Sequence, residues 1–151
     1  SGNAALDEVA VALWSFYGIK THIRLQDLCE LSRYVEEITG VLLPFNKPLV
    51  GYNAFTHELD IHAEQVLEHA PLFEPLPPDV VGNRRVMPLG RHVGPFIVEL
   101  KLKEYGLECD QNQIDEIAYR TRQQATQKKA SLSEDDFRNL VQTVLYRRSS
   151  I

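Results

Sequence analysis

Apolar side chains recur every three or four residues over most of this chain, which is the spacing of one face of an α-helix. Six segments share this spacing and are therefore predicted to be helical. They are residues 4–17, about 25–38, from Thr56 or His57 to Glu68, about 93–105, about 111–128 and about 133–146. The pattern thus predicts a mainly α-helical chain with little β-structure.

Several residues mark where these helices should begin and end. Asn3 is a candidate N-cap for the first helix, and Gly18 and Gly40 follow the first two helices at positions typical of helix ends. Ser133 and Asp136 have the spacing of a capping box, with Asp in place of the usual Glu or Gln, which predicts the start of the last helix.

Proline and glycine interrupt the helical pattern in two places. Residues 41–52 are expected to form a loop or a short extended piece, and residues 70–90 are expected to be irregular. A loop as long as the second is often functional. These breaks and the helices around them predict three parts, namely residues 1–40, 41–92 and 93–151.

The composition limits the compartment and the partners. The 151 residues carry a net charge of −5, which gives no reason to expect a nucleic-acid or anionic-membrane partner. No apolar run approaches the ~20 residues of a membrane span, and no signal-peptide pattern is visible. Cys29 and Cys109 are the only cysteines, and we expect free thiols in a cytoplasmic protein, although a disulfide between them stays open.

The residues most able to carry chemistry cluster at positions 57–62. Zinc peptidases use two histidines four residues apart, whereas His57 and His62 are five apart and would point roughly 140° away from each other on a helix. Glu58 lies four residues before His62 and could orient or charge its imidazole from the same helix face. An ordinary surface or capping role for either histidine stays open.

A second candidate lies where a loop enters the predicted helix at about residue 93. Backbone amides at that helix start, together with Arg91 and His92, could hold an anion. A turn that only begins the helix is an equal alternative, because the Gly-Lys-Ser/Thr ending of a phosphate loop is absent.

Residues 46–62 follow the pattern N-K-P-x-V-G-x-N-A-F-x-H-E-x-x-I-H, which resembles a segment of the homocitrate synthase / 2-isopropylmalate synthase family. These are metal-dependent barrel enzymes related to HMG-CoA lyase. Shorter stretches continue the resemblance in the same order along nearly the whole chain. They are residues 2–9, 18–21, 28–40, 78–82 and 89–94.

The resemblance implies part of an acyltransferase that joins acetyl-CoA to a 2-oxo acid, using a divalent metal (Mg, Mn or Zn). The chain would correspond to the last helix of a TIM-type barrel followed by small helical C-terminal subdomains. Asn3 would belong to or border the metal site, and His62 would enter the active site of the partner subunit in a homodimer. His57 and Glu58 are further catalytic candidates. The missing N-terminal barrel would be the main partner, and we expect neither metal nor acetyl-CoA to bind tightly to this chain alone.

Three departures from the family pattern leave an alternative open. Leu59-Asp60 stands where the family has Ser-Gly or Ala-Gly, and Val93 replaces a serine. Phe73 replaces a tyrosine whose hydroxyl is thought to assist the chemistry. The alternative is therefore a non-catalytic interaction or regulatory module derived from the family. In either case the apolar face of the helix over 4–17 is expected to be exposed in the isolated chain.

Overall fold

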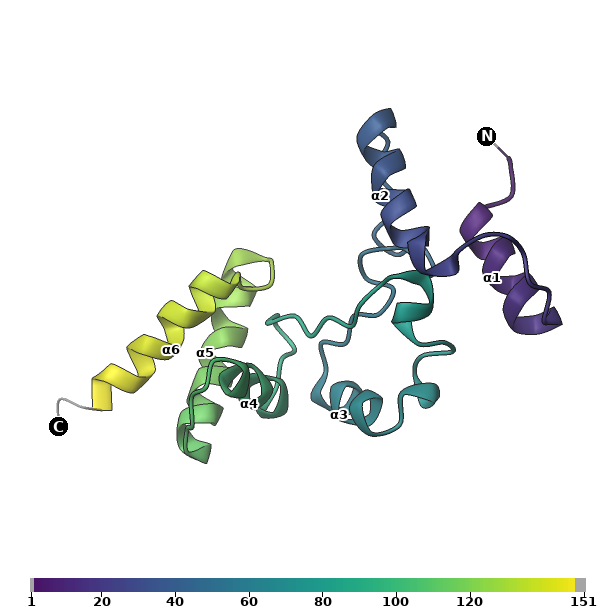
Figure 1. Cartoon of the computed structure of the whole chain (residues 1–151). Coiled ribbons are helices and arrows are strands. Elements are labelled where there is room, and N and C mark those ends of the chain that lie inside the picture. The colour runs from purple at the N-terminus through teal and green to yellow at the C-terminus, as the bar shows by residue number, and fades with distance from the viewer. Residues whose placement is uncertain (1, 149–151) are drawn as a thin grey trace. The chain divides into compact units, whose positions relative to one another are not determined.

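The computed structural model describes residues 2–148, with side chains up to Tyr146, and consists mainly of helices (Figure 1). The α-helices are α1 (Leu6–Tyr17), α2 (Leu28–Thr39), α3 (Asp60–Glu68), α4 (Pro95–Glu104), α5 (Gln111–Lys128) and α6 (Glu134–Arg148). Three short 3₁₀ turns join them, η1 (Leu25–Asp27), η2 (Ala70–Leu72) and η3 (Pro78–Val81). Over the described range, β-structure is limited to an isolated parallel bridge between Thr56 and Val86. The predicted mainly helical class is confirmed.

The predicted helix ends are mostly confirmed. Gly18 and Gly40 follow α1 and α2 with φ of 65° and 68°, the left-handed conformation that glycine adopts without strain. The predicted N-cap role of Asn3 is wrong, because α1 begins at Leu6 and its N-cap residue is Ala5, which makes no side-chain capping bond.

Capping boxes begin the last two helices. Before α6, the Ser133 hydroxyl accepts a hydrogen bond from the Asp136 backbone N–H at 3.2 Å, and the Asp136 carboxylate accepts the Ser133 N–H at 3.3 Å, as predicted. Asp110 and Gln113 exchange equivalent bonds of 2.8 Å at the start of α5. Each box satisfies amides that the first helical turn leaves unpaired.

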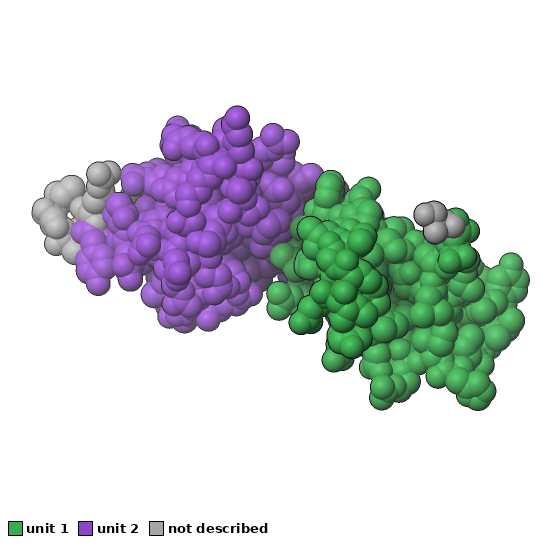
Figure 2. Space-filling view, turned by 90° about the horizontal axis from the view of Figure 1, so that it is seen from above, with its two compact units in different colours: residues 1–56, 74–86 green, residues 57–73, 87–151 purple. Residues whose placement is uncertain are grey.

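Packing divides the chain into two compact units (Figure 2). Unit 1 comprises residues 1–56 and 74–86, and unit 2 comprises residues 57–73 and 87–151. Residues 57–73, which include α3, therefore belong with the C-terminal helices although they interrupt unit 1 in sequence. The three-part division along the chain stays a prediction.

The core of unit 2 is a continuous apolar cluster that α4, α5 and α6 share with part of α3. Phe137 of α6 is fully buried, and its ring centroid lies 6.2 Å from that of Tyr105. Fully buried aliphatic side chains surround it from the other helices, including Ile97, Leu102 and Ile117. This cluster gives unit 2 a core of its own.

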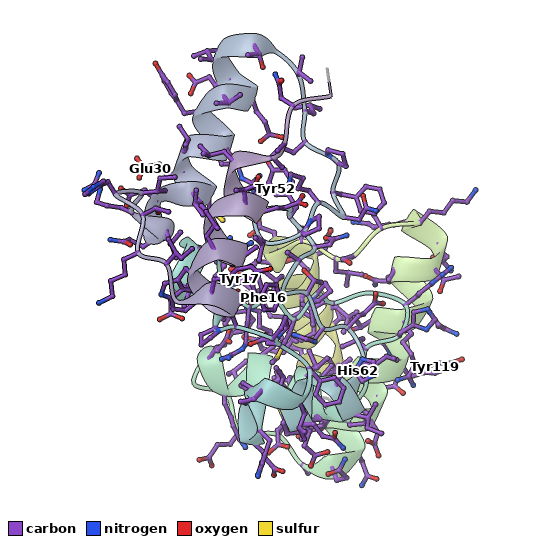
Figure 3. The ribbon with its side chains drawn as sticks, turned by 90° about the vertical axis from the view of Figure 1, so that its right-hand side faces the viewer. Phe16, Tyr17, Glu30, Tyr52, His62 and Tyr119 are labelled. Atoms are coloured by element: carbon purple, nitrogen blue, oxygen red, sulfur yellow. The ribbon has the colours of Figure 1, made fainter. Side chains whose placement is uncertain are left out.

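Unit 1 has a smaller core and a more apolar surface. Its buried apolar cluster consists of Val11, Leu28, Cys29, Val50, Phe55 and Val81. On α1, Phe16 is 81% exposed and Tyr17 is 74% exposed (Figure 3). The apolar face of this helix is therefore exposed only in part, because Ala10 is buried. Cys29 and Cys109 are both free thiols, and no helix in the described residues combines the length and apolarity that crossing a membrane requires.

A buried carboxylate joins α2 to the following loop. Glu36 is buried because the loop after α2 folds back over it. Its carboxylate accepts hydrogen bonds from the Leu43 backbone N–H at 2.6 Å and the Tyr52 hydroxyl at 3.2 Å. Arg33 adds a third contact at 3.5 Å. The Leu43 hydrogen bond, with help from Tyr52 and Arg33, lowers the pKa of Glu36 below its usual value.

Candidate functional site

The segment before α3 determines how the candidate residues are arranged. Residue 59 is the N-cap of α3, with extended backbone at φ −90° and ψ 134°, so His57 and Glu58 lie ahead of the helix. His62 lies in its first turn, and its backbone N–H donates to the Leu59 carbonyl at 3.0 Å. The sequence prediction that α3 begins at Thr56 or His57 is therefore wrong by about one turn.

Glu58 turns towards the loop that precedes α4. Its Oε1 accepts a hydrogen bond from the His92 backbone N–H at 2.8 Å. Gly90 permits this approach, because a Cβ at that position would lie 2.3 Å from the same oxygen. The predicted pairing of Glu58 with the His62 imidazole on a shared helix face is wrong, since Glu58 is not on the helix.

Asp60 caps α4 although it belongs to α3. Its carboxylate accepts backbone N–H groups from Gly94 at 3.0 Å, Phe96 at 2.8 Å and Ile97 at 3.3 Å. These are amides of the kind that a helix N-terminus leaves unpaired, and a negative charge is favourable there. The sequence predicted an anion at this helix start, and the Asp60 carboxylate of the chain itself occupies that position.

The Leu59-Asp60 departure from the family pattern introduces no backbone strain. Among the described residues other than glycine, a positive φ occurs at Leu49 and Lys129 alone. Neither position 59 nor position 60 therefore needs the conformational freedom of glycine. Asp60 instead adds three hydrogen bonds that a glycine could not make.

His62 and Phe73 lie against each other in unit 2. Their ring centroids are 5.2 Å apart, and the ring planes are inclined by 41°. His62 is partly buried, and Phe73 is 38% exposed after η2. Large apolar side chains nearby in sequence are also exposed, namely Leu59, Ile61, Leu67 and Leu72. Two residues selected separately from the sequence therefore contact each other at the surface of unit 2, with His62 labelled in Figure 3.

An open pocket of about 520 Å³ lies beside Glu58. Its cationic side chains are Arg91 and Lys129, and Thr126 and Ser131 add hydroxyl groups. The Nε of Arg91 also donates to the His92 imidazole at 3.0 Å. Sequence analysis found Arg91 and His92 but not Lys129, because the turn after α5 is distant in sequence.

Asn3 does not form a metal site with the rest of the chain. It is exposed in the segment before α1. In residues 2–148, no group of three or more His, Cys, Asp or Glu side chains has a metal-binding arrangement. A single carboxamide does not make up a divalent metal site, so the residues present do not fit one without donors from elsewhere.

In unit 1, two of the family-like segments bind one another. The Lys47 ammonium pairs with Asp7 at 2.8 Å and also with Glu8. The Asn83 amide donates to the backbone carbonyls of Leu49 at 2.9 Å and Gly51 at 3.3 Å. These contacts fix the turn over 47–51 within unit 1.

An ion pair between a buried carboxylate and a surface arginine also stabilises unit 1. Glu74 is 4% exposed, and its two oxygens accept hydrogen bonds from the Arg85 Nε at 2.9 and 2.8 Å. A second guanidinium nitrogen of Arg85 lies 2.7 Å from Glu74. The Glu74 carboxylate raises the pKa of Arg85. Sequence analysis missed this pair because nothing local to either residue indicates burial.

The sequence model of the family described as "Homocitrate synthase post-HMGL domain-like" matches residues 49–129, which is more than half of the chain. The chain belongs to this family. The matched range contains α3, α4 and α5, together with the carboxylate contacts of Glu58 and Asp60. The family resemblance drawn from the sequence is confirmed.

Individual relatives match a larger share of the chain than the family model does. The 2-isopropylmalate synthase of Methanocaldococcus jannaschii is 48% identical over 123 residues, which are 79% of this chain and 24% of that protein. A protein of Methanopyrus kandleri named as a candidate (R)-citramalate synthase is 45% identical over 147 residues, 97% of this chain and 29% of its own. The chain thus spans about a quarter of the length of these relatives.

Proposed function

We propose that this chain is the C-terminal part of a homocitrate-synthase-like acyltransferase that condenses acetyl-CoA with a 2-oxo acid. Membership of the family supports this proposal, as do relatives named for 2-isopropylmalate and (R)-citramalate synthesis. Because those relatives are far longer than this chain, the chain by itself would be inactive and would complete a site formed mostly by other residues.

His62 is the residue proposed to act in the chemistry, in the active site of a partner subunit. The observation that supports this role is its position, partly exposed in the first turn of α3 and packed on Phe73, which is itself 38% exposed. A partner surface that covered these side chains would exclude water from the imidazole. An imidazole can accept or donate a proton near neutral pH, which the removal of a proton from the acetyl group requires. His57 and Glu58 are proposed to support this site.

The exposed face of α1 is proposed to pack on the missing barrel as its last helix. Leu6, Val9, Phe16 and Tyr17 are exposed on this helix, although side chains of this size are usually covered. The divalent metal and acetyl-CoA of the complete enzyme would be held mainly by that barrel, with Asn3 at the border of the metal site. Contacts between subunits would come from the surface around His62.

One observation favours the alternative of a non-catalytic interaction module. The aromatic ring packed on His62 belongs to phenylalanine, so the hydroxyl that the family places in the following loop is missing. If that hydroxyl is essential, this surface would bind a partner without supporting turnover.

The test is acetyl-CoA condensation by the full-length parent protein. The metal-loaded enzyme is given 2-oxoglutarate, 2-oxoisovalerate or pyruvate, and release of free CoA thiol is measured. We expect turnover with one acceptor, and a loss of roughly 10²-fold or more in kcat for His62→Ala. His69→Ala, at the exposed opposite end of α3, is the matched control and should retain activity. A folded parent that turns over none of the three acceptors would support the non-catalytic module.

A further inference from the structure

We propose that Glu58 and Asp60 are positioning residues for His62, because they fix the start of α3 to the start of α4. This inference rests on the proposed role of His62. We use the name carboxylate clamp for these two carboxylates together with Gly90 and Gly94, which lie opposite them. The clamp joins segments that are 34 to 37 residues apart in sequence.

The clamp acts on the backbone that carries His62. Asp60 is the first residue of α3 and also accepts three amides of the first turn of α4. The Leu59 carbonyl accepts the N–H groups of His62 at 3.0 Å and Ala63 at 2.9 Å, so the same short turn includes His62. Any shift of Asp60 would therefore shift the Cα of His62.

Packing restricts the remaining freedom of this turn. Ala63, directly after His62, is fully buried in the core cluster of unit 2. The imidazole of His62 itself contacts the Phe73 ring. With its backbone held by the clamp and its ring held by Phe73, the His62 side chain has a defined direction, as proton transfer to a bound substrate requires.

The two glycines leave room for the carboxylates. Gly94 has φ −109° and ψ −176°, an extended conformation that any residue adopts. A Cβ on Gly94 would nevertheless lie 2.1 Å from the Asp60 Oδ2, and one on Gly90 would lie 2.3 Å from the Glu58 Oε1. A side chain at position 94 would therefore collide with the Asp60 carboxylate where it now lies, although the backbone there would accept one.

The first test compares two capping carboxylates of unit 2. Asp60→Asn replaces one acceptor oxygen by an NH₂ group that faces backbone donors. Asp110→Asn makes the same change at the N-cap of α5 and is the matched control. NMR of the 151-residue chain follows the His62 ring protons, assigned with His62→Gln. Asp60→Asn should move these signals towards those of a free imidazole, because the His62 ring would no longer contact Phe73. Asp110→Asn should leave the His62 signals unchanged.

Equal His62 signals in Asp60→Asn and the unaltered chain would overturn the inference. Equal displacement of these signals in both variants would also overturn it, because the effect would then reflect a general loss of stability. Neither result depends on whether His62 takes part in catalysis.

The second test uses turnover of the full-length parent protein. Asp60→Asn should lower kcat by about tenfold or more while KM changes by less than about twofold, because a displaced reacting group slows the chemical step. If His62→Ala abolishes turnover but Asp60→Asn leaves kcat unchanged, the inference fails and the proposed function stands. If His62→Ala has no effect on turnover, the proposed role of His62 itself fails.

A double-mutant cycle tests the clamp geometry. Gly94→Ala should displace the His62 ring signals as Asp60→Asn does, since the new methyl group occupies the position of the Asp60 carboxylate. In an Asp60→Gly background the collision is absent, so adding Gly94→Ala should cause no further change. Equal effects of Gly94→Ala in both backgrounds would show that position 94 needs glycine for another reason.

Discussion

Unit 1 and unit 2 are stabilised in different ways. Unit 2 has a continuous apolar core in which Phe137, Ile97 and Ile117 are almost fully buried. Unit 1 has a smaller apolar cluster, and polar contacts such as the hydrogen bond from the Asn83 amide to the Leu49 carbonyl join its two segments. The apolar side chains that unit 1 could have buried are instead exposed on α1 and α2. They include Leu6, Val9, Phe16, Tyr17, Tyr34 and Ile38.

This difference indicates which unit is complete by itself. A domain that buries its large apolar side chains needs no further partner for stability, whereas extended apolar surface usually marks an interface. Unit 2 is therefore expected to keep its structure in the isolated chain. Unit 1 is expected to gain stability when the proposed barrel covers α1.

The largest effect on stability should come from a cavity in the core of unit 2. Phe137→Ala should lower the free energy of unfolding of unit 2 by about 3–5 kcal/mol, because it removes a fully buried ring and leaves a cavity. Circular dichroism during urea unfolding would measure the loss. Trp14 on α1 is the only tryptophan, and its fluorescence reports on unit 1 separately. An equal shift of the Trp14 transition would show that the two units unfold as one.

The next effect concerns the polar contacts of unit 1. Arg85→Ala should lower the stability of unit 1 by about 2–3 kcal/mol, because the buried Glu74 carboxylate would lose its bidentate partner. The midpoint of urea unfolding, followed by Trp14 fluorescence, measures the change. Arg84→Ala, at the exposed neighbouring position, is the control and should stay within about 0.5 kcal/mol. Similar losses in both variants would argue against a special role for the ion pair.

A smaller effect should appear only in acid. The pKa of Glu36 in the folded chain lies below its ordinary value of 4.5, so its contribution to stability is complete above that pH. The contribution is lost as the pH falls through the folded pKa. Thermal unfolding between pH 6 and 3, followed by Trp14 fluorescence, should therefore show a steeper decline for the unaltered chain than for Glu36→Gln. Glu37→Gln, at the exposed next position, should decline like the unaltered chain.

The smallest effect compares two residues with left-handed backbone, one in each unit. Lys129 has φ 53° at the exposed end of α5, so Lys129→Gly should stabilise unit 2 by about 0.5–1 kcal/mol through relief of strain. Leu49 has φ 64°, but its side chain packs against the core of unit 1. Leu49→Gly should therefore give no net gain in thermal stability. A gain in both variants would show that the packing of Leu49 is unimportant.

Sequence periodicity predicted the helices well where local residues define their ends. Residues 111–128 were predicted to be helical and are α5, since the Asp110 capping box fixes its start. Predictions of helix ends failed where contacts with residues distant in sequence determine the end. The start of α3 was placed too early, because the carboxylates of Glu58 and Asp60 bind amides more than 30 residues away.

The candidate site could be predicted only in part, for the same reason. His62 and Phe73 were both selected, but no pattern in the sequence shows that their rings meet. Glu58 was selected for a contact with His62 that its place before the helix prevents. The burial of Glu36 was missed because the helical pattern does not show a loop folding back over the polar face of α2.

The interleaving of the two units has a consequence for the order in which they can form during synthesis. The chain passes from one unit to the other after residues 56, 73 and 86, so unit 1 is fully synthesised once residue 86 has left the ribosome. Helix α3 has emerged by then, but the amides that Asp60 binds belong to residues 94–97, and the core around Phe137 emerges later still. Unit 1 therefore has the opportunity to fold first, with the segment that carries His62 held out as a loop until α4 arrives.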